Sequence, residues 1–220
     1  MKAFLIPLAA AALIAMPAAA KPAHAAAKPA AVALPAGDYA LDKPHASLTF
    51  TLSHMGFSHY TARFTSFDAH MTLDPAHPEK AKLTATIDPM SLELNAPPPG
   101  FHDQLLGKDW LDARLTPQWT FASTKIVKTG VRTARVTGDF TMHGVTRPVT
   151  LDVTFNGGYP GLAGMDPHAR VGFSAHGVLK RSDFGVKAGI PAPGTNLGVS
   201  DEVTIALECE FTGPALKANP

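Results

Sequence analysis

The sequence predicts an all-β protein, built as one antiparallel barrel or sandwich of about eight strands. Apolar residues recur at every second position in eight separate segments, and turn-rich connections join those segments. Only one stretch has helical spacing instead. Alternation of this kind gives each strand one apolar and one polar face, as in antiparallel sheets that bury a single face.

The first alternating segment starts at His45. In it Leu48, Phe50 and Leu52 share one face, and His54 continues that face. The later segments with the same alternation are residues 67–73, 83–87, 119–121, 134–142, 149–155, 171–175 and 203–211. Residues 66–74, 131–142 and 168–180 suggest strands of nine or more residues, against a usual length of about five or six. An eight-stranded barrel of such strands has room for packed side chains or for one slender ligand.

Residues 101–113 (FHDQLLGKDWLDA) are predicted to form the single helix. Leu106 and Trp110 lie four residues apart, with Leu105 and Leu111 beside them. The preceding APPPG stretch excludes a strand, and Pro117 ends the unit. A short amphipathic helix in an all-β chain is expected to cover one end of the barrel.

The N-terminus has the pattern of an export signal. Lys2 precedes an apolar run that ends in small residues, so residues 1–20 are expected to be a signal peptide, cleaved after Ala20 or after Ala27. Residues 21–37 are rich in Ala and Pro and predict a flexible leader, residues 38–212 the folded domain, and residues 213–220 a fraying tail. The only cysteine, Cys209, allows no internal disulfide and lies far from the signal, so no lipid anchor is expected. We therefore expect a periplasmic protein.

Composition and motif spacing argue against several function classes. The formal net charge is +1 and 17% of residues are charged, which gives no basis for nucleic-acid binding. The chain has 10 His but no H-E-x-x-H, His-x-His or cysteine pair, so no metal site and no cofactor are predicted. The segment GFSAHG misses the G-x-S-x-G spacing by one residue, and no acid–base pair is assembled, so a non-catalytic protein is expected.

Several blocks of the sequence resemble YceI-like proteins. The opening block YALDKPHASLTFTLSHMG supplies Tyr39, Asp42, His45, Phe50, His54 and Gly56 in the family's order, and IDPMSL, HDQLLGKDWLD, PQWTFAST, GDFTMHGVTRPV, RSDFGV and VSDEV follow. The match covers residues 38–212. The resemblance implies an elongated, lipocalin-like, eight-stranded antiparallel barrel with an apolar tunnel. It also implies a periplasmic location, binding of a polyisoprenoid or other long-chain amphiphile, and, through relatives associated with cytochrome b561-type proteins, quinone handling.

The apolar strand faces supply the candidate ligand contacts. The predicted tunnel residues are Leu48, Phe50, Leu52, His54, Phe67, Phe121, Phe140, Leu151, Val153, Phe173 and Leu207. For His54 two interpretations stay open: an imidazole hydrogen-bonded to a neighbour, or a polar group that orients a ligand head group. Period two does not by itself show which face of each strand points inward.

Four polar residues are predicted at the tunnel mouth: His45, His143, Arg181 and Asp183. Arg181 and Asp183 are expected to pair or to bind loop backbone, with contact between Arg181 and an anionic head group as the alternative. The Gly- and Pro-rich loops 156–169 and 187–198 are either lids or solvated connections.

These observations predict a periplasmic carrier that sequesters a polyisoprenoid or similar lipid. Its partner would be a long-chain apolar small molecule. The alternative is a quinone-binding accessory or docking partner of a cytochrome b561-type membrane protein. A transient contact with an inner-membrane protein and a homodimer are both compatible with the sequence.

Overall fold

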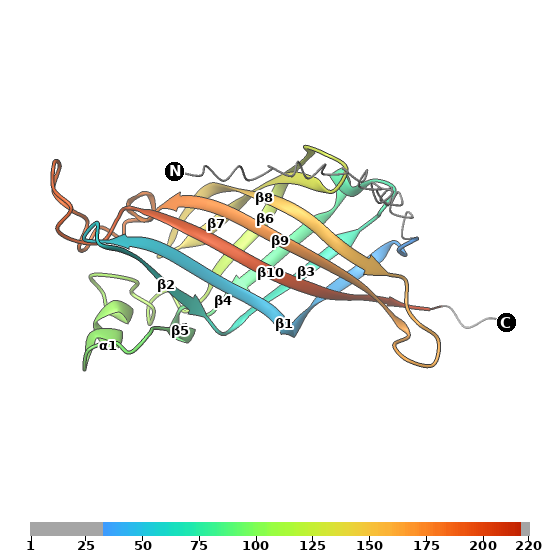
Figure 1. The fold of residues 1–220 in the computed structure, drawn as a ribbon, viewed down its shortest axis with the longest axis horizontal. Helices are drawn as coiled ribbons and strands as arrows, with labels where there is room; N and C mark the ends of the chain where they lie inside the picture. Colours follow the sequence, from blue (N-terminus) through green and yellow to red (C-terminus); the bar gives the residue numbers. More distant parts are fainter. Residues whose placement is uncertain (1–32, 217–220) are drawn as a thin grey trace, which may run out of the picture. The chain divides into compact units, whose positions relative to one another are not determined.

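The computed structural model describes residues 33–216, and these form one β-barrel with a short helix at one end (Figure 1). The barrel strands are β1 (Gly37–His54), β3 (Phe67–Leu73), β4 (Lys82–Ile87), β6 (Trp119–Lys128), β7 (Thr133–Met142), β8 (Val145–Tyr159), β9 (His168–Lys180) and β10 (Glu202–Ala215). The remaining elements are β2 (Ser58–Phe64) and β5 (Leu92–Glu93), which extend the sheet beside β1, the helix α1 (Phe101–Leu106), and the 3₁₀ turns η1 (Pro78–Lys80), η2 (Pro89–Ser91) and η3 (Arg181–Phe184).

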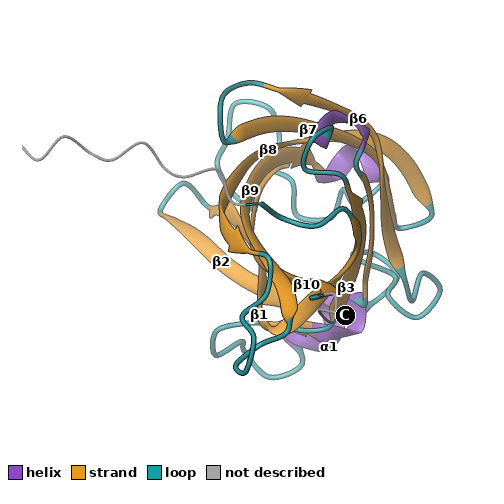
Figure 2. Ribbon diagram, turned by 90° about the vertical axis from the view of Figure 1, so that its right-hand side faces the viewer, coloured by secondary structure: helices purple, strands orange, loops and turns teal. Residues whose placement is uncertain are grey.

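The barrel closes because the last strand pairs with the first. β10 pairs antiparallel with β1 from Ala40↔Thr212 to Thr51↔Thr204, and every other neighbouring pair is also antiparallel. Figure 2, from the side turned by 90°, shows the strands as a ring. The predicted eight-stranded antiparallel barrel is therefore confirmed, and closure removes the free edges that an open sheet would expose.

β1 changes neighbours halfway along its length. Residues 37–40 pair with β3, a bulge follows between Leu41 and Ala46, and residues 48–54 pair with β2. Sequence analysis did not separate β2 from the first strand. The signal was present, because Tyr60, Ala62 and Phe64 alternate, and Gly56, with φ of 69°, allows the tight turn between the two strands.

The helix is shorter than predicted. α1 ends at Leu106, and Gly107 leaves the helix with extended backbone while its N–H still donates to the Gln104 carbonyl. Residues up to 113 continue as turns rather than as helix. The single short helix is confirmed and begins at Phe101 as predicted, but its predicted end at residue 113 is wrong because Gly107 stops it after six residues.

Two of the three strands expected to have nine or more residues do so, since β7 has 10 residues and β9 has 13. β1 has 18 residues, β8 has 15 and β10 has 14. β3 has seven residues rather than nine or more. It ends at Leu73 because Asp74 binds the Ala76 N–H at 2.9 Å in a turn, and Pro75 has no N–H to donate.

The two ends of the barrel differ, and we name them by their contents. The helix end carries α1, η3, the β1–β2 and β7–β8 turns and the connection from η3 to β10. The termini end carries the start of β1, the end of β10 and the β3–β4, β6–β7 and β8–β9 connections. Tyr39, Val171 and Phe211 pack together at the termini end and are almost fully buried. The Tyr39 ring packs directly against Gly213. A Cβ at position 213 would lie only 2.1 Å from a ring carbon of Tyr39, so the position requires glycine.

The boundaries of the folded part extend slightly beyond the expected 38–212. β1 begins at Gly37, the Tyr39 hydroxyl donates to the Pro35 carbonyl at 2.6 Å, and β10 continues to Ala215. The predicted signal peptide and most of the predicted leader, together with residues 217–220, lie outside the described residues. Within residues 33–216, no helix combines the length and apolarity needed to cross a membrane.

Candidate functional site

The barrel encloses an apolar cavity of about 290 Å³. All its lining residues except Arg181 have apolar side chains, counting Cys209 and two tryptophans. On β10 the lining residues run from Val203 to Phe211, which is about 26 Å along the strand at about 3.3 Å per residue and about 20 Å along a barrel axis tilted by about 40°. The cavity is therefore long and narrow.

Ten of the eleven predicted tunnel residues lie on the cavity wall. These are Leu48, Phe50, Leu52, Phe67, Phe121, Phe140, Leu151, Val153, Phe173 and Leu207. Alternation identified the inward face correctly because each strand of a closed barrel has only one face toward the axis. Their contact with a ligand remains a prediction.

His54 is the exception. It is the last residue of β1, its side chain is exposed, and it is absent from the cavity wall. The strand ends and turns at Met55, so the inward face stops at Leu52 even though the sequence spacing continues. Both interpretations of His54, as a hydrogen-bonded imidazole and as a group that orients a ligand, placed its side chain on the buried apolar face. The exposed position of His54 contradicts both.

Further wall residues were missed by sequence reasoning. Phe64 belongs to β2, which the sequence analysis did not separate from the first strand. Trp119 shares an alternating segment with Phe121, but only Phe121 was predicted to line the tunnel. Leu105, Trp110 and Leu111 also line the cavity, although the last two follow the end of α1. Helical spacing had grouped these three residues on one apolar face but had not assigned them to the cavity wall, and Trp110 and Leu111 reach the wall from turns rather than from a helix.

Aromatic side chains form a continuous row beside the cavity at the helix end. Phe50 contacts Phe64 at 5.5 Å between ring centroids, Phe64 contacts Trp119 at 5.2 Å, and Trp119 contacts Phe140 at 6.4 Å. Phe140 in turn meets Phe184 at 5.5 Å. The last three pairs are edge-to-face, and pairs of this kind stabilise by about 0.5–1.5 kcal/mol each beyond their burial.

Arg181 is a buried cation at the same end, 6% exposed. Its guanidinium donates to the backbone carbonyls of Val186, Ala188, Val199 and Ser200 at 2.6–3.3 Å and lies over the Trp110 ring. Burial lowers the pKa of Arg181 below its ordinary value. Of the two expectations for Arg181, binding to loop backbone is confirmed, and it fastens both ends of the 187–198 loop.

A family model described as the YceI-like domain matches residues 39–211. The chain belongs to the YceI-like family. A UPF0312 protein of Pseudomonas putida (strain GB-1) is 40% identical over 156 residues, covering 69% of this chain and 78% of that protein. The crystal structure of Burkholderia cenocepacia BcnA matches with a TM-score of 0.63 at 29% identity, covering 77% of this chain and 98% of BcnA.

A third relative shares the fold alone. A protein described as a polyisoprenoid binding domain from Saccharophagus degradans, implicated in plant cell wall breakdown, matches with a TM-score of 0.55 at 16% identity. The alignment covers 80% of this chain and 98% of that one. The resemblance to YceI-like proteins inferred from the sequence blocks is thus confirmed for the family and for the barrel.

In this YceI-like barrel the other predicted mouth residues do not converge. His143 lies in the β7–β8 turn with its Nδ1 3.1 Å from the Phe184 carbonyl, and Asp183 is exposed and forms no ion pair with Arg181. His45 lies outside the barrel wall, near the termini end. Among these four residues only Arg181 lines the cavity.

The two Gly- and Pro-rich loops lie at opposite ends, so they do not border one mouth. β8 and β9 extend into the first, leaving a connection of residues 160–167 at the termini end. There Asp166 accepts hydrogen bonds from the Tyr159 hydroxyl, the His168 N–H and Arg170 Nε at 2.9–3.1 Å. The second loop belongs to the helix end.

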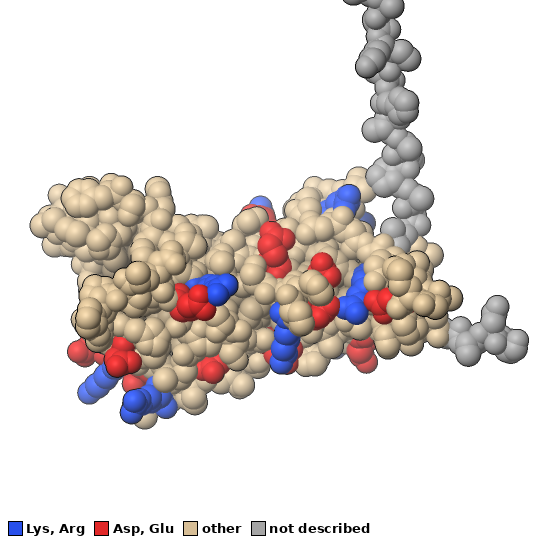
Figure 3. Space-filling view, turned by 60° about the horizontal axis from the view of Figure 1, so that its bottom comes forward, with Lys and Arg blue, Asp and Glu red and all other residues tan. Residues whose placement is uncertain are grey.

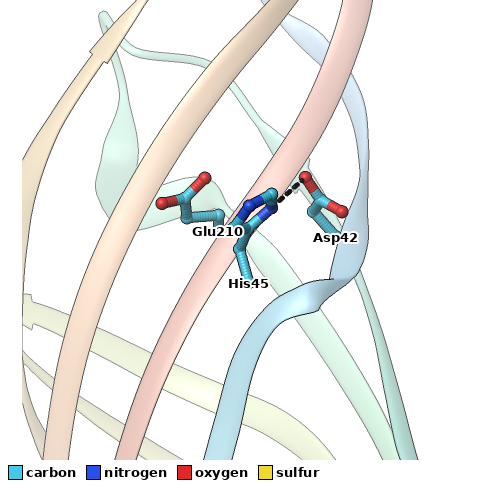
Figure 4. Close-up of side chains that lie close together, drawn as sticks. All are labelled: Asp42, His45 and Glu210. Carbon is cyan, nitrogen blue, oxygen red and sulfur yellow. Dashed lines mark hydrogen bonds and ion pairs between the residues drawn. The ribbon is translucent and has the colours of Figure 1, made fainter.

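One group within residues 33–216 could hold a metal ion by the position of its ligand atoms: Asp42, His45 and Glu210 lie together at the β1 bulge (Figure 4). However, Asp42 already accepts hydrogen bonds from His45 Nδ1 and Arg170 Nη1. Arg170 also binds Asp166, so the Asp42 carboxylate is neutralised within a surface network. The group therefore serves best as a brace between the bulge of β1 and β9 across β10.

Proposed function

We propose that this protein is a carrier that holds a long-chain apolar lipid, of polyisoprenoid or similar type, inside its barrel. The observation that carries the proposal is the long cavity of about 290 Å³, whose wall is apolar over its whole length. A compact polar substrate would find a single charged group there, Arg181, whose guanidinium is already bound to four carbonyls. Such a wall favours a hydrocarbon chain.

The affinity would come from burial of chain carbons. Each buried methylene contributes about 0.8 kcal/mol, so ten contribute about 8 kcal/mol, the free energy of a micromolar complex. Association also costs translational, rotational and conformational entropy, and the burial of further methylenes in a longer chain offsets this cost. Because an apolar wall distinguishes chains mainly by length, selectivity for a head group would arise at the helix end.

Two further observations support the proposal. The chain is a member of the YceI-like family, and a more distant protein of the same fold is described as a polyisoprenoid binding domain. The cavity wall also contains no nucleophile paired with a base, which fits a binding protein better than an enzyme. The N-terminal sequence supports export to the periplasm, where a water-insoluble lipid would require such a carrier.

A second candidate, binding of an isoprenoid quinone beside a membrane redox protein, is favoured by the aromatic row. Phe50, Phe64, Trp119 and Phe140 line the cavity at the helix end, where they could stack against a quinone ring while the prenyl tail fills the barrel.

Lipid extraction of protein purified from its native compartment, followed by mass spectrometry, tests both candidates. A prenyl phosphate, prenyl alcohol or acyl lipid in near-stoichiometric amount supports the carrier, and a prenyl quinone supports the redox accessory. Protein that contains no lipid, and that binds no added long-chain lipid in solution, contradicts both.

A further inference from the structure

The helix end carries a surface with no charged residue. Residues 53–60, around the β1–β2 turn, and residues 188–200, in the connection to β10, contain no Asp, Glu, Lys or Arg. We call these two segments the tip. Phe57 and Leu197 extend from it with 83% and 72% of their surface exposed. In Figure 1 the second segment projects at the left, and the lobe at the upper left of Figure 3 is tan throughout on the face in view.

The two segments of the tip are joined as one unit. The Met55 N–H donates to the Gly198 carbonyl at 2.7 Å, and the Ser200 N–H donates to the Ser53 carbonyl at 2.9 Å. The Ser200 hydroxyl accepts from the Ser53 N–H at 2.9 Å. Asn196 lies against Gly56. Phe57 and Leu197 are therefore presented on a fixed support rather than on two independent loops.

The base of the tip is continuous with the cavity. Leu52, which directly precedes the tip, and Val199, within it, both line the cavity. Arg181 holds the base by binding the carbonyls of Val199 and Ser200 at 2.9 Å. A chain that leaves the cavity at the helix end would therefore emerge beside the exposed apolar side chains.

We propose that the tip docks the barrel onto a phospholipid bilayer, with Phe57 and Leu197 entering the boundary between head groups and acyl chains. Insertion at this boundary buries apolar side chains and becomes costly when charges must leave water. The tip has the apolar side chains and lacks the charges. The purpose of docking rests on the proposed carrier function: the lipid would pass between bilayer and barrel without crossing water.

The same features favour a bilayer over a protein partner or a second copy. Protein interfaces use complementary charges to select a partner and to set its orientation, and the tip offers none. A stable dimer also buries about 800 Å² on each partner, whereas the tip is a narrow projection in Figure 1. A bilayer requires neither a matching surface nor a fixed orientation about its normal.

The termini end supplies a matched control. Val131 is 98% exposed there, but it lies between Gly130 and Arg132, and Lys128 is close in sequence. Val131→Glu therefore replaces an exposed apolar side chain by a carboxylate, as glutamate substitutions at Phe57 and Leu197 do, but it leaves the tip unchanged.

The test is flotation of the purified protein with protein-free phosphatidylcholine vesicles in a density gradient. We expect wild-type protein to float, and 0.05 and 0.5 M NaCl to give the same result because no ion pair is involved. Phe57→Glu and Leu197→Glu should each reduce the floating fraction at least tenfold, whereas Val131→Glu should float as wild type does.

Three results would overturn the docking proposal. The first is wild-type protein that does not float on these vesicles, including protein that binds only membranes containing other proteins. The second is self-association abolished by Phe57→Glu in the absence of vesicles. The third is an equal loss in Val131→Glu.

A titration with a fluorescent long-chain acyl probe, in solution without vesicles, separates this proposal from the carrier function. Phe57→Glu and Leu197→Glu should retain the wild-type Kd within about twofold. Protein that binds the probe but does not float would contradict docking alone. Protein that floats but does not bind the probe would contradict the carrier function alone.

Discussion

The two ends of this barrel are built from the same alternating strands, but they differ in how the interior is filled and in the charge of the surface. At the termini end Tyr39, Ala169 and Val171 fill the interior, and the connections outside carry charged residues such as Glu79 and Arg132. At the helix end the same inward positions border the cavity, many of them half-buried, and the tip carries no charge. The difference shows that a closed barrel can combine a rigid, packed half with a hollow half.

The largest effect is expected from a truncation in the packed half. Tyr39→Ala should lower the free energy of unfolding by about 3–5 kcal/mol, because it leaves a cavity among residues that have no room to relax. Phe50→Ala should cost about 1–2 kcal/mol, because its half-buried ring already borders empty space. Urea denaturation measures both variants. Equal losses would contradict the contrast between the two halves.

Loss of the buried guanidinium should be the next largest effect. Arg181→Met should reduce the free energy of unfolding by about 3 kcal/mol, because four carbonyls lose a charged donor. The neighbouring exposed Lys180→Met is the control and should change stability little. Hydrogen exchange should show faster opening of residues 187–200 in the Arg181 variant. Unchanged exchange there would mean that Arg181 does not fasten the loop.

Trp119 offers a smaller and unusual effect. Its indole Nε1–H is buried with no hydrogen-bond partner among the described residues. Trp119→Phe removes this unsatisfied donor and keeps most of the ring, so stability should stay within about 1 kcal/mol of wild type. Urea denaturation, followed through the remaining Trp110, checks this. A loss comparable to that of Tyr39→Ala would show that the indole N–H has a partner.

The smallest effect is expected in the hydrogen-bonded loop at the termini end. The His168 N–H, the Tyr159 hydroxyl and Arg170 lower the pKa of Asp166 below its ordinary 3.8. A lowered pKa stabilises the fold at pH values above 3.8, and this contribution is lost as the pH falls further. Asp166→Asn should therefore be less stable than wild type at pH 7, and the difference should shrink only as the pH falls below 3.8 and through the lowered pKa. Asp139→Asn serves as the control, because the exposed Asp139 carboxylate takes no part in the hydrogen bonds to Asp166. A difference between wild type and Asp166→Asn that stays constant across pH would refute the assignment.

The interior of the barrel was largely predictable from the sequence, and its helix end was not. Leu48, Phe140 and Leu207 were assigned to the wall correctly because period two and closure together leave one inward face. At the helix end the strands stop, and the direction of a side chain depends on turns. His54 therefore points away from the predicted site, while Trp110, beyond the end of α1, reaches the cavity.

Tertiary contacts also decided the roles of the polar candidates. The sequence placed Arg181 near a strand end, but only the fold brings Ala188, Val199 and Ser200 around its guanidinium. Likewise, Asp42 and Arg170 are 128 residues apart and meet because β10 lies between β1 and β9. Local patterns contain no information about such pairs, because they depend on strand order.

The most direct measurement is the affinity of a fluorescent long-chain acyl probe for a barrel whose cavity has been filled. Ala175 lines the cavity, whereas Ala122 faces outward and is exposed. Ala175→Phe should weaken probe binding at least tenfold while Ala122→Phe binds as wild type does, with both variants folded by circular dichroism. Equal affinity of all three proteins would contradict the claim that the hollow half of the barrel holds the ligand.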